Sequence, residues 1–189
     1  MNMFIKSIAG IFGGGFKMPK IIKDPEERIL QAARKRLLGS DLSSFSLRGV
    51  ASDCGIAVGT IYNYFKDKES LMAAVMAQDW AKAREEAGRE LAEVPSLREG
   101  LVCICRKIRF FCLLYQEVWS SHPAGGDFST RYRTRHELLL SQIREMILGL
   151  YERFDVPCPE NRRTLLAELI IAGAQHPEIR EEEIIEIIV

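Results

Sequence analysis

Apolar residues recur at helical spacing along most of the chain, and no useful stretch alternates in the way a strand would. The pattern predicts these helices: 24–39, two short ones within 46–66, 68–92, 96–120, 128–154, 161–175 and 177 onward. Pro95 and the segments 121–127 (SHPAGGD) and 155–159 (DVPCP) separate the longer ones. The chain is therefore predicted to be all-α, with a small three-helix domain followed by a larger helical body.

Residues 46–71 (SLRGVASDCGIAVGTIYNYFKDKESL) carry the most specific pattern in the chain. Ser46 stands where it can cap a helix, and Gly55 where that helix would end in the left-handed conformation. Ile61 and Phe65 are four residues apart, so they share a face that we expect to be buried. The opposite face offers hydroxyl, amide and cationic groups and no acid: Thr60, Tyr62, Asn63 and Lys66. Such a face suits phosphates and base edges.

This segment resembles the helix-turn-helix of the TetR family of transcriptional regulators. The resemblance is carried by Val50-Ala51, Gly55-Ile56, Gly59-Thr60-Ile61-Tyr62, Tyr64-Phe65 and Lys66-Asp67-Lys68-Glu69-Ser70-Leu71. It covers residues 27–75, and beyond them it rests on chain length and the helical pattern. It implies a DNA-binding domain over 24–70, and a body over 71–189 that binds an effector and forms the dimer.

The resemblance also assigns the DNA contacts. Thr60 corresponds to the residue that meets a base or phosphate, and Tyr62 to the tyrosine whose hydroxyl binds a phosphate. Lys68 corresponds to the lysine at the start of the next helix, where free backbone amides also favour an anion. The complete set expected at the DNA is Ser46, Arg48, Val58, Thr60, Tyr62, Asn63, Tyr64, Lys66 and Lys68.

Several of these positions leave alternatives open. Arg48 is placed to reach a base edge such as guanine, and Asn63 a base or a phosphate. Tyr64 either packs against the first helix of the motif or touches the DNA backbone. Two positions depart from the family pattern: Ala57 forgoes the usual side-chain cap, and Val58 cannot donate a hydrogen bond, although it can pack on a thymine methyl.

An aromatic stripe marks the predicted helix 96–120, where Phe111, Tyr115 and Trp119 recur at every fourth position. One interpretation is core packing. The other is a pocket in which a flat, apolar effector stacks on aromatic rings. Its expected lining is Trp80, Phe111, Tyr115, Trp119, His122 and Tyr132. His136 either adds a titratable contact there or is solvated.

Composition adds little to the prediction of function. The net charge is zero, but residues 1–70 carry +4 and residues 71–189 carry −4, which fits a DNA-binding domain fused to a second domain with another role. The five cysteines form no C-x-x-C pair, which indicates reduced, buried thiols of a cytoplasmic protein; redox sensing by Cys103 or Cys105 is the alternative. The three histidines make no metal-site spacing, so we expect no metal and no cofactor.

The two ends of the chain are distinctive. Residues 1–23 are expected to be a flexible arm whose lysines touch the DNA backbone, with translation from an upstream start and an amphipathic membrane anchor as alternatives. Their apolar run is too short to span a bilayer.

Residues 184–189 at the other end of the chain are rich in isoleucine. The last predicted helix therefore looks cut short, unless its pattern simply ends there. Such an end requires a partner surface. The matching face expected on the preceding helix is Leu165, Leu166, Leu169 and Ile170.

These observations predict a cytoplasmic, homodimeric, ligand-responsive repressor that binds a near-palindromic DNA operator and is released by a small apolar or aromatic effector. No membrane partner is expected. The alternative is a helical small-molecule-binding protein with a vestigial DNA-binding domain. An enzyme that uses Cys112 and His122 as nucleophile and base is not expected, because nothing in the sequence places an orienting group beside them.

Overall fold

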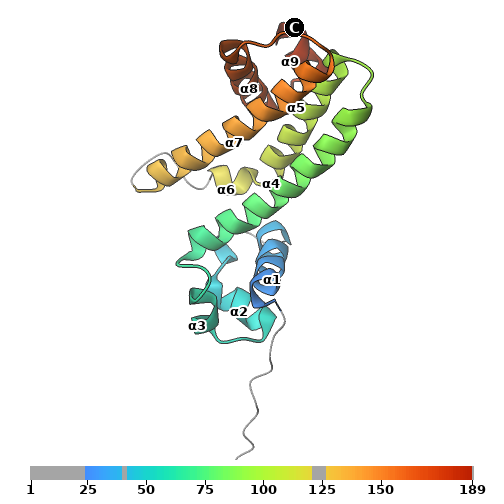
Figure 1. The fold of residues 1–189 in the computed structure, drawn as a ribbon. Helices are drawn as coiled ribbons and strands as arrows, with labels where there is room; N and C mark the ends of the chain where they lie inside the picture. Colours follow the sequence, from blue (N-terminus) through green and yellow to red (C-terminus); the bar gives the residue numbers. More distant parts are fainter. Residues whose placement is uncertain (1–23, 40–41, 121–126, 189) are drawn as a thin grey trace, which may run out of the picture.

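The computed structural model describes residues 24–39, 42–120 and 127–188, and this part of the chain is helical with no strand (Figure 1). The predicted all-α fold is therefore confirmed. The expected arm over residues 1–23 lies outside the described residues. A bundle of short helices at one end is joined to a larger helical body by one long helix, α4.

The smaller unit contains α1 (Pro25–Gly39), a 3-10 turn η1 (Leu42–Ser44), α2 (Leu47–Cys54) and α3 (Val58–Tyr62). Helix α1 packs against both α2 and α4. Its apolar residues at positions 29, 30, 33 and 37 are buried, as their helical spacing predicts. Val50 of α2 and Ile61 of α3 are both completely buried in the same core.

Polar contacts at its edges fix α1 against its neighbours. The Arg36 guanidinium donates to the Asp53 carboxylate, with Nη2 2.8 Å from Oδ1. Gln78 Nε2 of α4 donates to Glu27 Oε2 at 2.7 Å. These bonds hold α1 between α2 and α4, so the position of α1 depends on both helices.

Helix α4 (Lys68–Glu93) runs from the smaller unit into the body. At 1.5 Å per residue it is about 39 Å long. Leu71, Met72 and Val75 are buried in its first half, and Trp80 and Ala87 are buried further along. The helix therefore crosses the boundary predicted between residues 70 and 71 without a break, and contributes to the cores on both sides of it.

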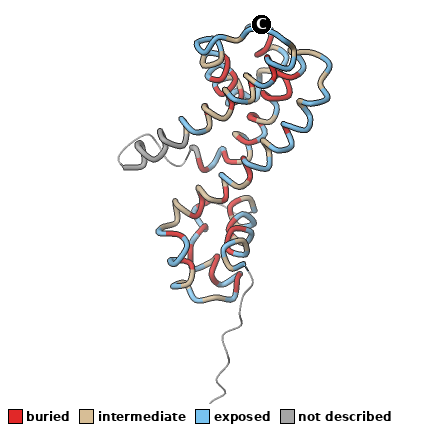
Figure 2. Tube along the Cα trace, viewed as in Figure 1, coloured by how far each residue is buried: buried red, intermediate tan, exposed pale blue. Residues whose placement is uncertain are grey.

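The body is built around α5 (Leu97–Leu114), which contacts α4, α7 (Asp127–Arg153), α8 (Glu160–Ala174) and α9 (Glu181–Ile188). Figure 2 shows the buried positions concentrated along the inner faces of these helices. Arg109 of α5 is 9% exposed and donates to the carbonyls of Gly173 and Ile179. It thereby ties the central helix to the end of α8 and the turn that precedes α9.

The prediction of one helix over 96–120 is wrong. Helix α5 ends at Leu114, Tyr115 leaves the helical conformation (φ −115°, ψ 19°), and a short helix α6 covers Gln116–Ser120. The Tyr115 side chain is 1% exposed, and its hydroxyl donates to Asp79 Oδ2 at 2.7 Å. No proline or glycine marks the break. The tertiary contact with Asp79 accompanies it and is not visible in the local sequence.

The last helix also differs from its prediction. It begins at Glu181 rather than at Pro177, because residues 177–180 form a turn closed by the Ile179 amide donating to the His176 carbonyl at 3.1 Å. The other long helices start and end within two residues of the predicted positions.

Candidate nucleic-acid interface and ligand pocket

The turn between α2 and α3 is formed by local contacts that the sequence predicts. Ser46 Oγ accepts from the Gly49 amide at 3.1 Å and caps α2. Gly55 ends α2 with φ 63°, a left-handed conformation that costs glycine little, and its amide returns to the carbonyls at the end of α2. Ala57 precedes α3 and makes no side-chain cap, as expected.

Helix α3 carries only two of the four residues predicted for its polar face, Thr60 and Tyr62, because it is short. It ends at Tyr62, and Asn63 follows as its C-cap. Tyr62 is 56% exposed and Tyr64 42% exposed. Arg48, Asn63 and Lys66 are also exposed, whereas Thr60 is half-buried. Asn63, Tyr64 and Lys66 therefore belong to the turn after α3 rather than to the helix.

Val58 and Tyr64 are two of the positions at which the sequence left alternatives open. Val58 is half-buried and packs against the core from the start of α3. Part of its side chain is therefore committed to folding, and its contact with a thymine methyl stays a prediction. Tyr64 is exposed, and its ring lies 6.5 Å from that of buried Phe65 in a tilted arrangement.

The start of α4 completes the polar surface. Asp67 and Ser70 form a capping box, in which Asp67 Oδ1 accepts from the Ser70 amide at 2.7 Å and Ser70 Oγ accepts from the Asp67 amide at 3.1 Å. Lys68 is half-buried, with its ammonium 5.7 Å from the centre of the Phe45 ring. The cation is thus held beside Phe45, the residue that precedes the N-cap of α2.

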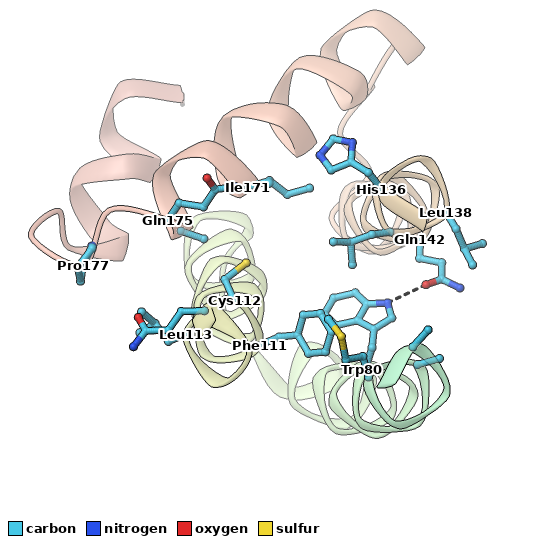
Figure 3. A pocket seen from close by; sticks show the side chains of 16 residues that line it. Trp80, Phe111, Cys112, Leu113, His136, Leu138, Gln142, Ile171, Gln175 and Pro177 are labelled. Carbon is cyan, nitrogen blue, oxygen red and sulfur yellow. Dashed lines mark hydrogen bonds between the residues drawn. The ribbon is translucent and has the colours of Figure 1, made fainter. Parts of the chain in front are cut away.

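In the body, a cavity of about 540 Å³ opens between α4, α5, α7 and α8 (Figure 3). Its described walls are mainly apolar, and the polar groups are three amides and an imidazole, two of these four groups coming from α7. The lining residues are Ala73, Met76, Ala77, Trp80, Phe111, Cys112, Leu113, Gln116, His136, Leu138, Leu139, Gln142, Ile171, Ala174, Gln175 and Pro177. An apolar cavity with a few polar groups is the usual form of a small-molecule site.

The predicted pocket residues fall into three groups. Trp80 and Phe111 line the cavity, and their rings lie 5.2 Å apart. Tyr115 is not part of the lining; it is buried behind Phe111, with 5.3 Å between the two rings. The side chains of Trp119, His122 and Tyr132 lie outside the described residues.

His136, for which two interpretations were open, lines the cavity and is half-buried. Sequence reasoning missed the amide groups beside it, above all Gln142 of α7, whose Oε1 accepts from the Trp80 indole at 2.7 Å. Figure 3 shows this bond across the cavity wall. A single polar residue in a helix does not reveal which neighbour it will face, so the sequence held no signal for this pair.

Asp79 was also missed. It is 8% exposed, and Arg34 Nε of α1 lies 2.8 Å from each of its carboxylate oxygens, while the Tyr115 hydroxyl also donates to Oδ2. Burial, and then this hydrogen bond, raise the pKa of Tyr115, so its hydroxyl keeps its proton. The sequence did hold a signal for Asp79. It follows Leu71 and Val75 at the same four-residue spacing, so it lies on the buried face of the helix, where a carboxylate without a partner is costly.

The cysteines are free thiols, as predicted. Burial raises the pKa of the Cys103, Cys105 and Cys112 thiols to about 11. Reactive, redox-sensing thiols have the opposite shift, so these groups have the character of buried apolar side chains. Among the described residues, no group of three or more His, Cys, Asp or Glu could hold a metal ion, and no helix is long and apolar enough to cross a membrane.

Comparison with known proteins identifies the smaller unit. Residues 29–75 match the profile of bacterial regulatory proteins of the tetR family. The chain is 38% identical over 56 residues to the HTH-type transcriptional regulator UidR of Escherichia coli (strain K12), covering 30% of this chain and 29% of UidR. It is 34% identical over 62 residues to an HTH-type transcriptional regulator of Staphylococcus aureus (strain USA300), covering 33% and 34%. The chain thus spans about a third of the length of these curated relatives.

Solved structures share the fold over most of the chain. FadR of Bacillus subtilis, a transcriptional regulator solved with stearoyl-CoA, has a TM-score of 0.59 at 14% identity and covers 87% of this chain and 97% of its own. FadR of Bacillus halodurans, a fatty acid degradation regulator, has a TM-score of 0.57 at 15% identity and covers 88% and 94%. The TetR family regulator CifR, solved as a cysteine mutant with operator DNA, has a TM-score of 0.52 at 17% identity and covers 90% and 95%.

At such identities the structural matches establish the fold alone, whereas the profile and the curated relatives identify the helix-turn-helix. Residues 29–75 are therefore a helix-turn-helix of the tetR family of bacterial regulatory proteins.

Proposed function

We propose that this protein is a cytoplasmic, ligand-responsive repressor that binds a near-palindromic operator as a homodimer and is released by a small apolar or aromatic effector. One observation carries the proposal. The long helix α4 begins at the exposed polar surface of the helix-turn-helix and continues into the wall of a largely apolar cavity. This continuity supports the proposal, because one helix links the proposed DNA-binding surface to the proposed small-molecule site.

The proposed DNA contacts follow from exposure and charge. Tyr62 and Lys68 bind phosphates, and Arg48 reaches a base edge from the start of α2. Phosphate contacts set the position of α3 in the major groove, while base contacts give sequence specificity. The homodimer places two copies of α3 in successive major grooves, which accounts for a near-palindromic operator.

The proposed effector is uncharged. The described lining of the cavity contains no lysine, arginine, aspartate or glutamate, and its polar groups are Gln116, His136, Gln142 and Gln175. Trp80 and Phe111 offer aromatic faces for stacking. The CoA phosphates of stearoyl-CoA, the ligand bound to FadR of Bacillus subtilis, find no cation in this described lining. We therefore propose that a neutral aromatic compound releases the DNA more effectively than stearoyl-CoA does.

The proposed dimer uses apolar side chains that the single chain leaves exposed. Leu165 and Leu169 of α8 are 60% and 38% exposed, and Ile187 of α9 is 81% exposed. Leu166 and Ile170, which were expected on the same face, are instead buried inside the body. Replacing Leu165 and Leu169 by glutamate should convert the dimer to a monomer in sedimentation velocity, whereas a dimer that survives both changes argues against this interface.

Release of DNA requires that the effector favour a dimer whose two α3 helices are wrongly spaced. A coupling of about 1–3 kcal/mol is typical for such regulation. Because α4 connects the cavity to the helix-turn-helix, we propose that it acts as the lever. The proposal assigns the chain no catalytic activity, and the raised pKa of Cys112 agrees with that because it suppresses the thiolate that a nucleophile needs.

The proposal is tested by fluorescence anisotropy of labelled DNA from upstream of the protein's own gene, with scrambled DNA as the control. We expect tight binding to the upstream DNA with a steep dependence on salt, and release by a neutral aromatic effector. The rival, a helical carrier with a vestigial DNA-binding domain, predicts weak and equal binding to both DNAs by a protein that sedimentation shows to be a dimer. That result would overturn the regulator.

A further inference from the structure

A buried carboxylate joins the helix-turn-helix unit to the body. Asp79 of α4 accepts from Arg34 of α1 and also from Tyr115, at the break between α5 and α6. We call these three residues the Arg34–Asp79–Tyr115 network. Arg34 belongs to the helix-turn-helix unit and Tyr115 to the body. Displacing Tyr115 would therefore change the interaction between the Asp79 carboxylate and Arg34 of α1.

The same network borders the cavity. Trp80 follows Asp79 in the chain and lines the cavity, and its ring packs on Phe111 at 5.2 Å. Phe111 in turn packs on Tyr115 at 5.3 Å. A molecule that enters the cavity therefore touches two rings, one of which contacts Tyr115 directly while the other neighbours Asp79.

We propose that the Arg34–Asp79–Tyr115 network transmits occupancy of the cavity to α1, with Tyr115 and Arg34 as the positioning residues at its two ends. The proposal rests on the proposed function in one respect, that the cavity accepts a small molecule. A ligand that displaces Phe111 shifts Tyr115, which changes the hydrogen bonding of Asp79 and the seating of α1 against α4. The competing route is α4 alone, acting as a rigid rod that needs none of these side-chain bonds.

Conservative substitutions separate the two routes. Tyr115→Phe removes one hydroxyl and keeps the ring that packs on Phe111. Tyr151→Phe is the matched control, because Tyr151 is fully buried and its hydroxyl has no hydrogen-bond partner among the described residues. Arg34→Gln interrupts the network from the other end, at a side chain that is 45% exposed. Each variant is first compared with wild type by thermal unfolding, to establish that it is folded.

The experiment is amide hydrogen exchange on the full-length protein, with and without N-phenyl-1-naphthylamine, a neutral fluorescent probe. We expect the probe to slow exchange in the cavity-lining segments of all four proteins. In α1, which does not line the cavity, it should change exchange by about 5-fold or more in wild type and Tyr151→Phe. In Tyr115→Phe and in Arg34→Gln the response of α1 should be lost. A fifth protein that combines Tyr115→Phe with Arg34→Gln should lose no more of the response than either single variant.

An α1 response in Tyr115→Phe equal to that of wild type would overturn the network and favour α4 alone. Failure of the probe to bind wild type, or to affect α1 in it, would overturn it too. These failures are distinct from failure of the regulator. If upstream DNA is bound no better than scrambled DNA while α1 responds as described, the repressor is refuted and the network stands.

Discussion

Lys68→Ala tests the assignment of Lys68 to a DNA phosphate. Its ammonium is held beside the Phe45 ring, and Lys68 is the first residue of α4, at the end of the helix that favours anions. Each phosphate contact contributes about 0.9 to the slope of log K against log salt. A dimer loses two contacts in the variant, so the slope should fall by about 1.8.

Over a fourfold rise in salt, from about 50 to 200 mM, wild type should lose about 12-fold more affinity than the variant. Fluorescence anisotropy across a salt series measures this difference, on scrambled as well as upstream DNA, because a phosphate contact does not depend on sequence. Lys82→Ala is the control, since Lys82 is an exposed lysine further along the same helix, within the body. Its slope should equal that of wild type.

The loss of the Phe45 contact has a separate effect. A cation–π pair that water still reaches stabilises a protein by about 0.5–1 kcal/mol, so Lys68→Ala should lower the free energy of unfolding by at least this amount. A urea titration measures it and shows whether any variant is left partly unfolded in the binding assay. Equal salt slopes for wild type and a fully folded Lys68→Ala would refute the phosphate assignment.

Three further predictions follow from particular residues. Gly55→Ala should lower the free energy of unfolding by about 1–2 kcal/mol in a urea titration, because φ is 63° there although an added methyl meets no atom within 4 Å; an unchanged midpoint would contradict it. Tyr62→Phe should weaken binding to upstream and scrambled DNA by the same factor, roughly tenfold, by anisotropy; a loss confined to one DNA would point to a base contact. The raised pKa values of Cys103, Cys105 and Cys112 leave about 0.1% of each thiol as thiolate at pH 8, so Ellman's reagent should label these residues slowly. The free energy of unfolding should also fall as the pH rises from about 8.5 to 11, because these thiols ionise at lower pH in the unfolded chain than in the folded protein. Rapid labelling of all thiols in the native protein at pH 8 would be inconsistent with their burial.

Most helix boundaries were predictable because they depend on neighbouring residues. Ser46, Gly55 and Pro95 act within a few positions of themselves, and the structure places helix ends at or next to each of them. The burial of Ile61 and Phe65 followed from their spacing alone. The polar surface of the helix-turn-helix was predictable for the same reason, since it is what remains once the buried face is identified.

The cavity was predictable only in part, because its walls come from helices far apart in the sequence. Trp80 and Phe111 were identified as large aromatic residues, but nothing local indicated that Gln142 of α7 would bind the Trp80 indole. Tyr115 shows the same limit. Its place in an unbroken aromatic stripe predicted a helix, while its bond to Asp79 on another helix coincides with the break that local propensity did not reveal.

The brevity of α3 has an evolutionary consequence. A five-residue helix without a side-chain cap is not stable by itself, so the packing of Ile61 and Phe65 maintains its shape. The outward residues, above all Tyr62 and Asn63, contribute little to that packing. They can therefore change with little cost in stability, whereas Val58 cannot, because it packs partly against the core. Under the proposed function, substitutions on this surface would give descendants of this gene new operator sequences while the folded scaffold stays the same.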